Sequence, residues 1–141
     1  MSTYIDTSVL GAYYCPEPGS RAAEEALRRV NSPVISVLSE VEFWSLVSKK
    51  RRLKELNERQ ARGVLDLFGN HVAEGFYRRL SLSPEHYLKA RQLIELFAIP
   101  LHTLDAVHLA VAITEKLSLA TFDRALAAAA KRHKCKVMLV K

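Results

Sequence analysis

Short apolar runs rich in β-branched residues alternate with longer stretches of helical periodicity along the whole chain. The short runs span 3–6, 33–37, 76–80, 117–121 and 136–140. Continuous apolar runs of this length are typical of strands that are buried on both faces of a sheet. The pattern therefore predicts five short strands, most of them buried.

The stretches of helical periodicity span 20–30, 39–54, 58–72, 84–97 and 104–116, with a shorter one after Asp123. One of them, LDAVHLAVAI, is apolar around nearly its whole circumference, so this helix must be buried. Strands that alternate with helices of this length form a mainly parallel sheet with helices on both faces. We therefore expect an α/β fold.

The composition fits one domain. The chain has 141 residues, of which 49% are hydrophobic and 26% charged, and no repeat or Gly/Ser-rich linker divides residues 1–141. It has neither a signal-like amino terminus nor a run of the roughly 18 to 20 apolar residues that a membrane span requires. We expect a cytoplasmic protein without membrane contact, whose Cys15 and Cys135 stay reduced thiols.

The charge balance is basic. Lys and Arg number 21 against 15 Asp and Glu, which gives a net charge of +6 and makes a polyanionic partner worth considering. The densest basic run is Lys49, Lys50, Arg51 and Arg52. Such runs are more often solvated surface than binding sites, so charge alone leaves both interpretations open.

Four acids lie where a parallel sheet binds its ligands, near the carboxyl ends of strands. Asp6 ends the first strand, and Glu42 lies in the helix after PVISV. Asp105 opens the apolar helix, and Asp123 follows the run LATF. These four acids are the candidates for chemistry.

Three of the acids also have a simple structural interpretation. Asp6 and Asp123 each stand where a helix begins, and their carboxylates could accept the unpaired amide hydrogens there. Glu42 lies three residues after Ser39, which is the spacing of a capping box. On position alone, Glu40 is as good a candidate as Glu42.

Asp105 is harder to explain as a helix cap, because its helix must be buried and the carboxylate should be partly buried as well. A buried unpaired charge costs at least several kcal/mol, whereas the helix dipole returns only about 0.3 to 1 kcal/mol. Asp105 therefore needs a cation, several donors or a raised pKa. His108, one turn later, is interpreted as a core histidine.

Four segments, taken in order, resemble the PIN domain, specifically the VapC toxin subunit of VapBC toxin–antitoxin pairs. They are YIDTSVLGAYYCPEPGS, VISVLSEVEFWSLVSKKRR, LHTLDAVHLAVAI and LATFDRALAAAA. The resemblance implies a three-layer α/β/α sandwich with a central, mainly parallel sheet. It also implies an acidic metal site that hydrolyses RNA phosphodiester bonds.

The resemblance places the family's acids on Asp6, Glu42, Asp105 and Asp123. Glu42 matches better than Glu40 because it stands two residues before Trp44 in the run EFWS. The supporting hydroxyl residue matches Thr121. Ser8 stands where many relatives carry asparagine, and hydroxyl residues also occur there in similar sequences.

Four carboxylates at one sheet edge would repel and raise one another's pKa without a cation. Mg²⁺ or Mn²⁺ suits such an all-oxygen site and can acidify a water molecule for attack on the phosphodiester. Asp6 and Asp105 are expected as direct ligands, completed by Asp123 and Glu42. Ser8 and Thr121 would orient the carboxylates. Hydrolysis would leave a 5′ phosphate and a 3′ hydroxyl.

The main hypothesis is therefore a metal-dependent endoribonuclease toxin that forms a homodimer and is silenced by a VapB-like antitoxin. The basic run at 49–52 would contact RNA if it borders the acids. The antitoxin groove would use some of the large apolar residues that are otherwise interpreted as core: Tyr13, Tyr14, Phe43, Trp44 and Val47. The alternatives are a PIN nuclease in RNA maturation without a toxin role, and a non-catalytic RNA-binding module whose acids only cap helices.

Overall fold

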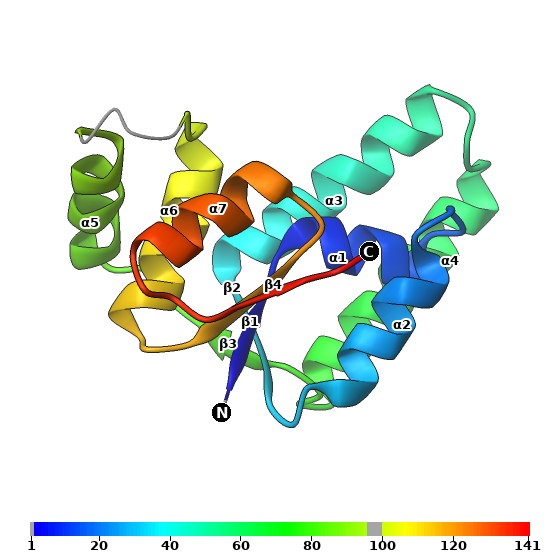
Figure 1. The fold of residues 1–141 in the computed structure, drawn as a ribbon. Helices are drawn as coiled ribbons and strands as arrows, with labels where there is room; N and C mark the ends of the chain where they lie inside the picture. Colours follow the sequence, from blue (N-terminus) through cyan, green and yellow to red (C-terminus); the bar gives the residue numbers. More distant parts are fainter. Residues whose placement is uncertain (1, 96–99) are drawn as a thin grey trace.

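The computed structural model describes residues 2–95 and 100–141, in which a five-stranded parallel sheet lies between helices (Figure 1). The strands are β1 (Thr3–Ile5), β2 (Pro33–Ser36), β3 (Arg78–Leu80), β4 (Ser118–Thr121) and β5 (Val137–Leu139). Their order in the sheet is β3-β2-β1-β4-β5, and every neighbouring pair is parallel. Each strand lies inside the apolar run that predicted it.

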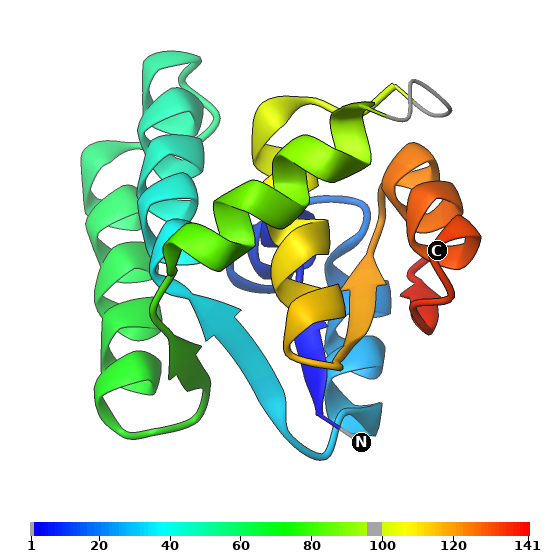
Figure 2. The same cartoon turned by 90° about the vertical axis from the view of Figure 1, so that its left-hand side faces the viewer.

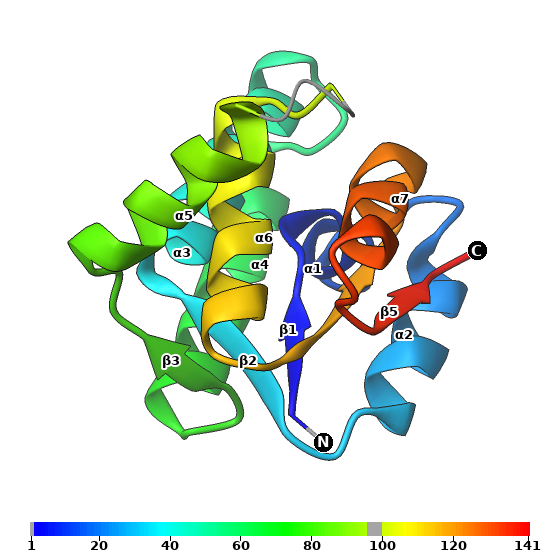
Figure 3. The same cartoon turned by 60° about the vertical axis from the view of Figure 1, so that its left-hand side comes forward.

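The helices of the described residues are α1 (Thr7–Tyr14), α2 (Ser20–Arg29), α3 (Val37–Arg52), α4 (Glu58–Ala73), α5 (Pro84–Glu95), α6 (Thr103–Thr114) and α7 (Arg124–Arg132). Figures 2 and 3 show α5 and α6 on one face of the sheet. The end of the helix predicted at 84–97 lies outside the described residues. The predicted three-layer α/β/α class is confirmed.

The strands alternate their side chains between two cores. Ile5 and Ile35 point into a core shared with α1 to α4, whereas Tyr4 and Val34 point into a core shared with α5, α6 and α7. This alternation follows from the two-residue period of a strand. Because both faces of the sheet are covered, its carboxyl edge is the place left for a site.

The start of α3 corrects the predicted capping box. Ser36, not Ser39, is the N-cap: its hydroxyl accepts a hydrogen bond from Ser39 N–H at 3.4 Å, and Ser39 Oγ accepts one from Ser36 N–H at 3.0 Å. The helix thus begins at Val37, within the run predicted as strand. The predicted pairing of Ser39 with Glu42 is wrong, so helix capping does not explain Glu42.

The aromatic residues of the first core pack closely. Phe43 and Phe68 have ring centroids 4.4 Å apart, and Tyr14 lies edge-on to both at 5.4 Å. Val47 is buried beside them. Trp44, in contrast, is 57% exposed, so its interpretation as a packing residue is wrong. One helix position turns a side chain by about 100°, which carries Trp44 away from the core that holds Phe43.

Nowhere in the described chain does a helix combine the length and the apolar character that a bilayer span needs. Cys15 and Cys135 are both buried free thiols.

Candidate active site

Asp6 follows β1, the central strand of the sheet, and is almost fully buried. Its side chain makes no cap hydrogen bond to α1, although it occupies the N-cap position. Instead, Oδ2 accepts hydrogen bonds from Ser8 Oγ at 2.7 Å and from Thr121 Oγ1 at 2.8 Å. The capping interpretation of Asp6 is therefore wrong, and two hydroxyl groups fix this carboxylate.

Asp105 lies in the first turn of α6 and is half-buried. Within residues 2–95 and 100–141 its carboxylate has neither a hydrogen bond nor an ion pair. Burial raises the pKa of Asp105, and the negative charges of Asp6 and Asp123 raise it further. Of the three possibilities for Asp105, several donors are not found among the described residues, which leaves a raised pKa or a cation.

Asp123 follows β4 and caps α7. Its Oδ1 accepts hydrogen bonds from the N–H groups of Ala125 at 2.8 Å and Leu126 at 3.1 Å, so its capping interpretation is confirmed. Its own N–H donates to Thr121 Oγ1 at 2.9 Å. Since the Thr121 hydroxyl also donates to Asp6, one buried side chain ties the two acids together.

Glu42 is held from two sides. Its Oε1 accepts hydrogen bonds from Thr7 Oγ1 at 2.8 Å and from His108 Nε2. Burial acts to raise the pKa of Glu42, but these bonds and the nearby imidazole outweigh burial and lower it. Glu42 is thus fixed as a carboxylate.

The four predicted acids line one hollow of about 440 Å³ at the carboxyl edge of the sheet. Figure 3 shows the starts of α1, α6 and α7 on this side of the sheet. The complete lining is Asp6, Thr7, Ser8, Glu42, Ser45, Leu46, Lys49, Leu104, Asp105 and Asp123. Thr121 supports the hollow through Asp6. Glu40 is not among the lining residues and pairs with Arg79.

The donor set fits a hard divalent cation, because it consists of carboxylate and hydroxyl oxygens. The half-buried carboxylate of Asp105, which has no partner among residues 2–95 and 100–141, is the strongest sign of this fit. Among the described residues, no three His, Cys, Asp or Glu side chains already surround one ion position. The carboxylates would therefore have to change position to share an ion.

The basic run does not form one surface. Lys49 lines the acidic hollow, and Lys50 pairs with Glu17 at 3.0 Å. Arg51 and Arg52 line a separate hollow of about 410 Å³ between α3 and α4. Consecutive helical residues point about 100° apart, which spreads the run around α3.

His108 and Thr7 are the site residues that the sequence reasoning missed. Both hold Glu42, although His108 is buried as predicted for a core histidine. A weak signal exists for His108, because it follows Asp105 by one helical turn and so shares its face.

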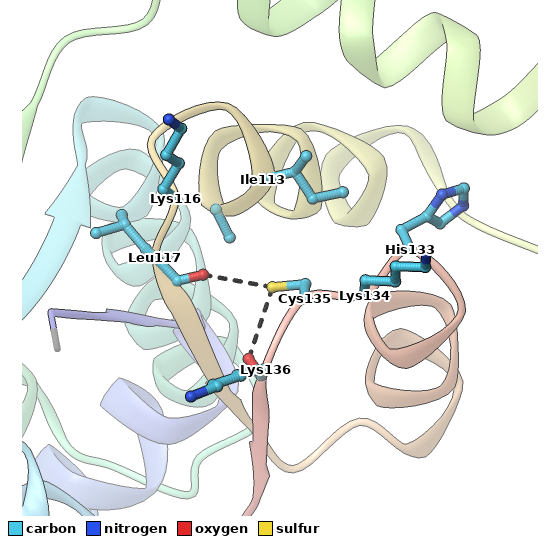
Figure 4. Close-up of a pocket in the computed structure, with 8 residues that line it drawn as sticks. Ile113, Lys116, Leu117, His133, Lys134, Cys135 and Lys136 are labelled. Carbon is cyan, nitrogen blue, oxygen red and sulfur yellow. Dashed lines mark hydrogen bonds between the residues drawn. The ribbon is translucent and has the colours of Figure 1, made fainter.

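A different hollow of about 360 Å³ lies at the amino ends of β4 and β5, away from the acids. Figure 4 shows the Cys135 thiol between the carbonyl groups of Leu117 and Lys136, to which it donates at 3.4 and 3.6 Å. The amino groups of Lys116 and Lys136 point away from the thiol in this view. Among the described residues, no acidic side chain lines this hollow, and the acidic hollow remains the candidate active site.

The PIN domain family model matches residues 3–132 of the chain. No curated protein matches it. Among solved structures, Mycobacterium tuberculosis VapC20, described as a sarcin-ricin loop cleaving toxin, is 17% identical with a TM-score of 0.71, over 91% of this chain and 95% of that chain. Rickettsia felis VapBC2, bound to a DNA fragment from its promoter, is 19% identical with a TM-score of 0.71, over 100% of both chains. A toxin–antitoxin complex from Klebsiella pneumoniae is 20% identical with a TM-score of 0.63, over 90% of this chain and 91% of that chain.

Proposed function

Because the chain belongs to the PIN domain family, we propose that it is a metal-dependent endoribonuclease and the toxin of a toxin–antitoxin pair. The observation that carries the proposal is the convergence of four carboxylates from separate segments on one hollow. One of them, Asp105, is half-buried and has no partner in the described part of the chain. We also propose that residues 1–141 form a single nuclease domain that works in the cytoplasm.

Asp6 and Asp105 would hold Mg²⁺ or Mn²⁺ directly, with Asp123 and Glu42 completing the site. When bound, the ion supplies charge neutralisation and acidifies a water molecule. Ser8 and Thr121 keep the Asp6 carboxylate in one orientation by donating to Oδ2. Because both hydroxyls bind the same oxygen, Oδ1 is left for the ion.

The acids on the edge of the hollow would aim the attacking water at the phosphorus, in line with the leaving 3′ oxygen. The proton released by the water would pass to a carboxylate, and the products would carry a 5′ phosphate and a 3′ hydroxyl. The hydrogen bonds from His108 and Thr7 hold Glu42 ionised, so its carboxylate is able to take up that proton.

RNA is proposed as the substrate because the family resemblance implies it. VapC20, which shares the fold, is described as a sarcin-ricin loop cleaving toxin. The test is to induce the protein in cells and sequence RNA ends, with Asp105→Asn as the inactive control. New 5′-phosphate ends at defined positions, absent from the control, are expected. Identical ends in both samples would contradict the proposal.

Two alternatives remain as competing outcomes. A nuclease in RNA maturation would share the chemistry, but no small antitoxin gene would lie immediately upstream. A non-catalytic module would need its acids only as caps, yet among the four only Asp123 makes a cap hydrogen bond with its side chain. The Asp6 geometry therefore favours an active site over helix capping.

Lys49 should contribute to RNA binding, since it lies on the wall of the acidic hollow. Replacing Lys49 by Ala should flatten the slope of log affinity against log salt by about 0.7, the value for one lost phosphate contact on a single strand. Arg52→Ala is the matched control, because Arg52 lines the hollow between α3 and α4. If both variants give the same slope, Lys49 does not contact an RNA phosphate.

Trp44 should anchor a VapB-like antitoxin. It is exposed beside Val47 and Leu65 in the hollow between α3 and α4. Truncating a Trp at the centre of an interface often costs about 2 kcal/mol or more of binding free energy. We expect Trp44→Ala to weaken the complex by about 30-fold in sedimentation at micromolar concentrations. Tyr87→Ala, an exposed aromatic residue on α5, should leave the affinity unchanged.

The same sedimentation experiment tests the proposed homodimer. The chain alone should sediment as a dimer that dissociates on dilution. A chain that stays monomeric and also ignores its upstream-encoded partner would defeat both partner proposals while leaving the nuclease proposal standing.

A further inference from the structure

A chain of buried hydrogen bonds leads from the sheet to the candidate active site. Ser36 Oγ lies 2.8 Å from Tyr4 Oη, and Tyr4 Oη lies 2.6 Å from His108 Nδ1. The opposite ring nitrogen, Nε2, contacts Glu42 Oε1. The chain thus joins β2, β1, α6 and α3 in one network.

The network is sealed from solvent along most of its length. Tyr4 and Ser36 are fully buried and His108 is 1% exposed, whereas Glu42 reaches the hollow. A carboxylate oxygen can only accept, so the ring nitrogen that contacts it, Nε2, carries a proton and donates it to Glu42. The Tyr4 hydroxyl holds the ring by the opposite nitrogen, Nδ1.

The network leaves one Glu42 oxygen unused. Oε1 accepts from both His108 and Thr7, while Oε2 receives no hydrogen bond from any described residue. With Oε1 fixed on the wall, Oε2 is the oxygen that the side chain offers to the hollow. Glu40 has no comparable anchor, since its partner Arg79 is more than half exposed.

We propose that His108 is a positioning residue that fixes the Glu42 carboxylate with one oxygen facing the active site, and that Tyr4 holds the ring by its other nitrogen. The inference rests on the proposed function for its catalytic consequence. Groups that orient metal-binding side chains typically contribute about 10- to 100-fold to metal affinity or activity. His108 acts through Glu42 and touches neither the ion nor RNA.

The ring itself gives the first test, which is independent of any enzymatic activity. Nitrogen-15 NMR of the full chain should find His108 protonated on Nε2, and Glu42→Gln should shift that resonance. His86 is a matched control, because it is also buried and lies 3.3 Å from Glu115, far from Glu42. A His108 ring without a proton on Nε2 would overturn the proposal.

The second test measures Mn²⁺ binding by calorimetry. His108→Leu should lower the affinity by about 10-fold or more, and His108→Gln, whose amide can still donate to Glu42, should restore most of it. His86→Leu should match the wild type. In RNA cleavage, His108→Leu should lower kcat and leave KM unchanged, because no phosphate contact is lost.

A Glu42→Gln background guards against a folding defect. If His108 acts only through Glu42, adding His108→Leu to Glu42→Gln should cause no further loss of Mn²⁺ affinity. Two results would overturn the proposal even if the wild type cleaves RNA. One is a double variant whose loss of Mn²⁺ affinity equals the sum of the two single losses, and the other is a His108→Leu variant that binds Mn²⁺ as tightly as the wild type. A wild type that neither binds Mn²⁺ nor cleaves RNA would contradict the proposed function instead. In that case, the NMR measurement of the ring would still show whether His108 donates to Glu42.

Discussion

Replacing Asp105 with Asn should abolish RNA cleavage, lowering kcat/KM by about 1,000-fold or more. The amide keeps the shape of the side chain but removes the charge from the one acid of the hollow that has no partner within the described residues. In a cleavage assay with an end-labelled RNA at saturating Mg²⁺, the variant should give no product. Asp6→Asn should behave in the same way, because Asp6 lies in the same hollow.

The same variant should fold at least as stably as the wild type. Burial and the charges of Asp6 and Asp123 raise the pKa of Asp105, so ionisation of Asp105 disfavours the folded state. As the pH falls from the raised pKa toward the ordinary value of 3.8, the folded wild type takes up a proton at Asp105 before the unfolded chain does. The unfolding free energy of the wild type should therefore rise relative to that of Asp105→Asn. Denaturant unfolding at several pH values measures the difference.

Asp66→Asn is the control for both measurements, because Asp66 is exposed on α4, away from the hollow. It should leave cleavage and its pH dependence unchanged. Full cleavage by both Asp6→Asn and Asp105→Asn would show that the acids do not perform the chemistry.

Divalent ions should stabilise the folded chain, and chelation should stop cleavage. Mn²⁺ at 100 times its dissociation constant should raise the unfolding free energy by about 2.7 kcal/mol, as for any ligand that binds only the folded state. The physical cause is the relief of repulsion among the four carboxylates. Thermal unfolding with Mn²⁺ and with EDTA measures the shift.

Asp105→Asn should lose most of this stabilisation, which separates a specific ion from general salt effects. K⁺ at the same ionic strength should have little effect on either protein. Full RNA cleavage in excess EDTA would contradict a metal-dependent mechanism, whatever the thermal shift.

The three inner strands, β1, β2 and β4, could be predicted from sequence because each is a short run that is almost wholly buried. The edge strands gave a weaker signal, since β3 carries the exposed Arg78 and Arg79 and β5 is only half-buried. The strand ends were harder to predict at one place, where Val37 continues the apolar character of PVIS but already belongs to α3. The hydroxyl of Ser36 ends the strand by capping the helix. Two serines three residues apart made both cap positions plausible, and only the backbone distinguishes them.

The convergence of the acids could be predicted because the carboxyl ends of parallel strands share one edge. The partner of Glu42 could not be predicted in this way. His108 lies 66 residues further along the chain, and its contact depends on how α3 and α6 are rotated about their axes. The exposure of Trp44 depends on the same rotation, because α3 carries apolar residues on more than one side.

The sheet order also determines when during synthesis the site can exist. β1 lies between β2 and β4, and Thr3 to Ile5 pair with Ser118 to Ala120 of a strand made near the end of translation. Until β4 has left the ribosome, Asp6 lacks the Thr121 hydroxyl, and β1 presents an open edge. A nascent or truncated chain therefore has no assembled acid cluster and offers an unpaired strand to chaperones and proteases.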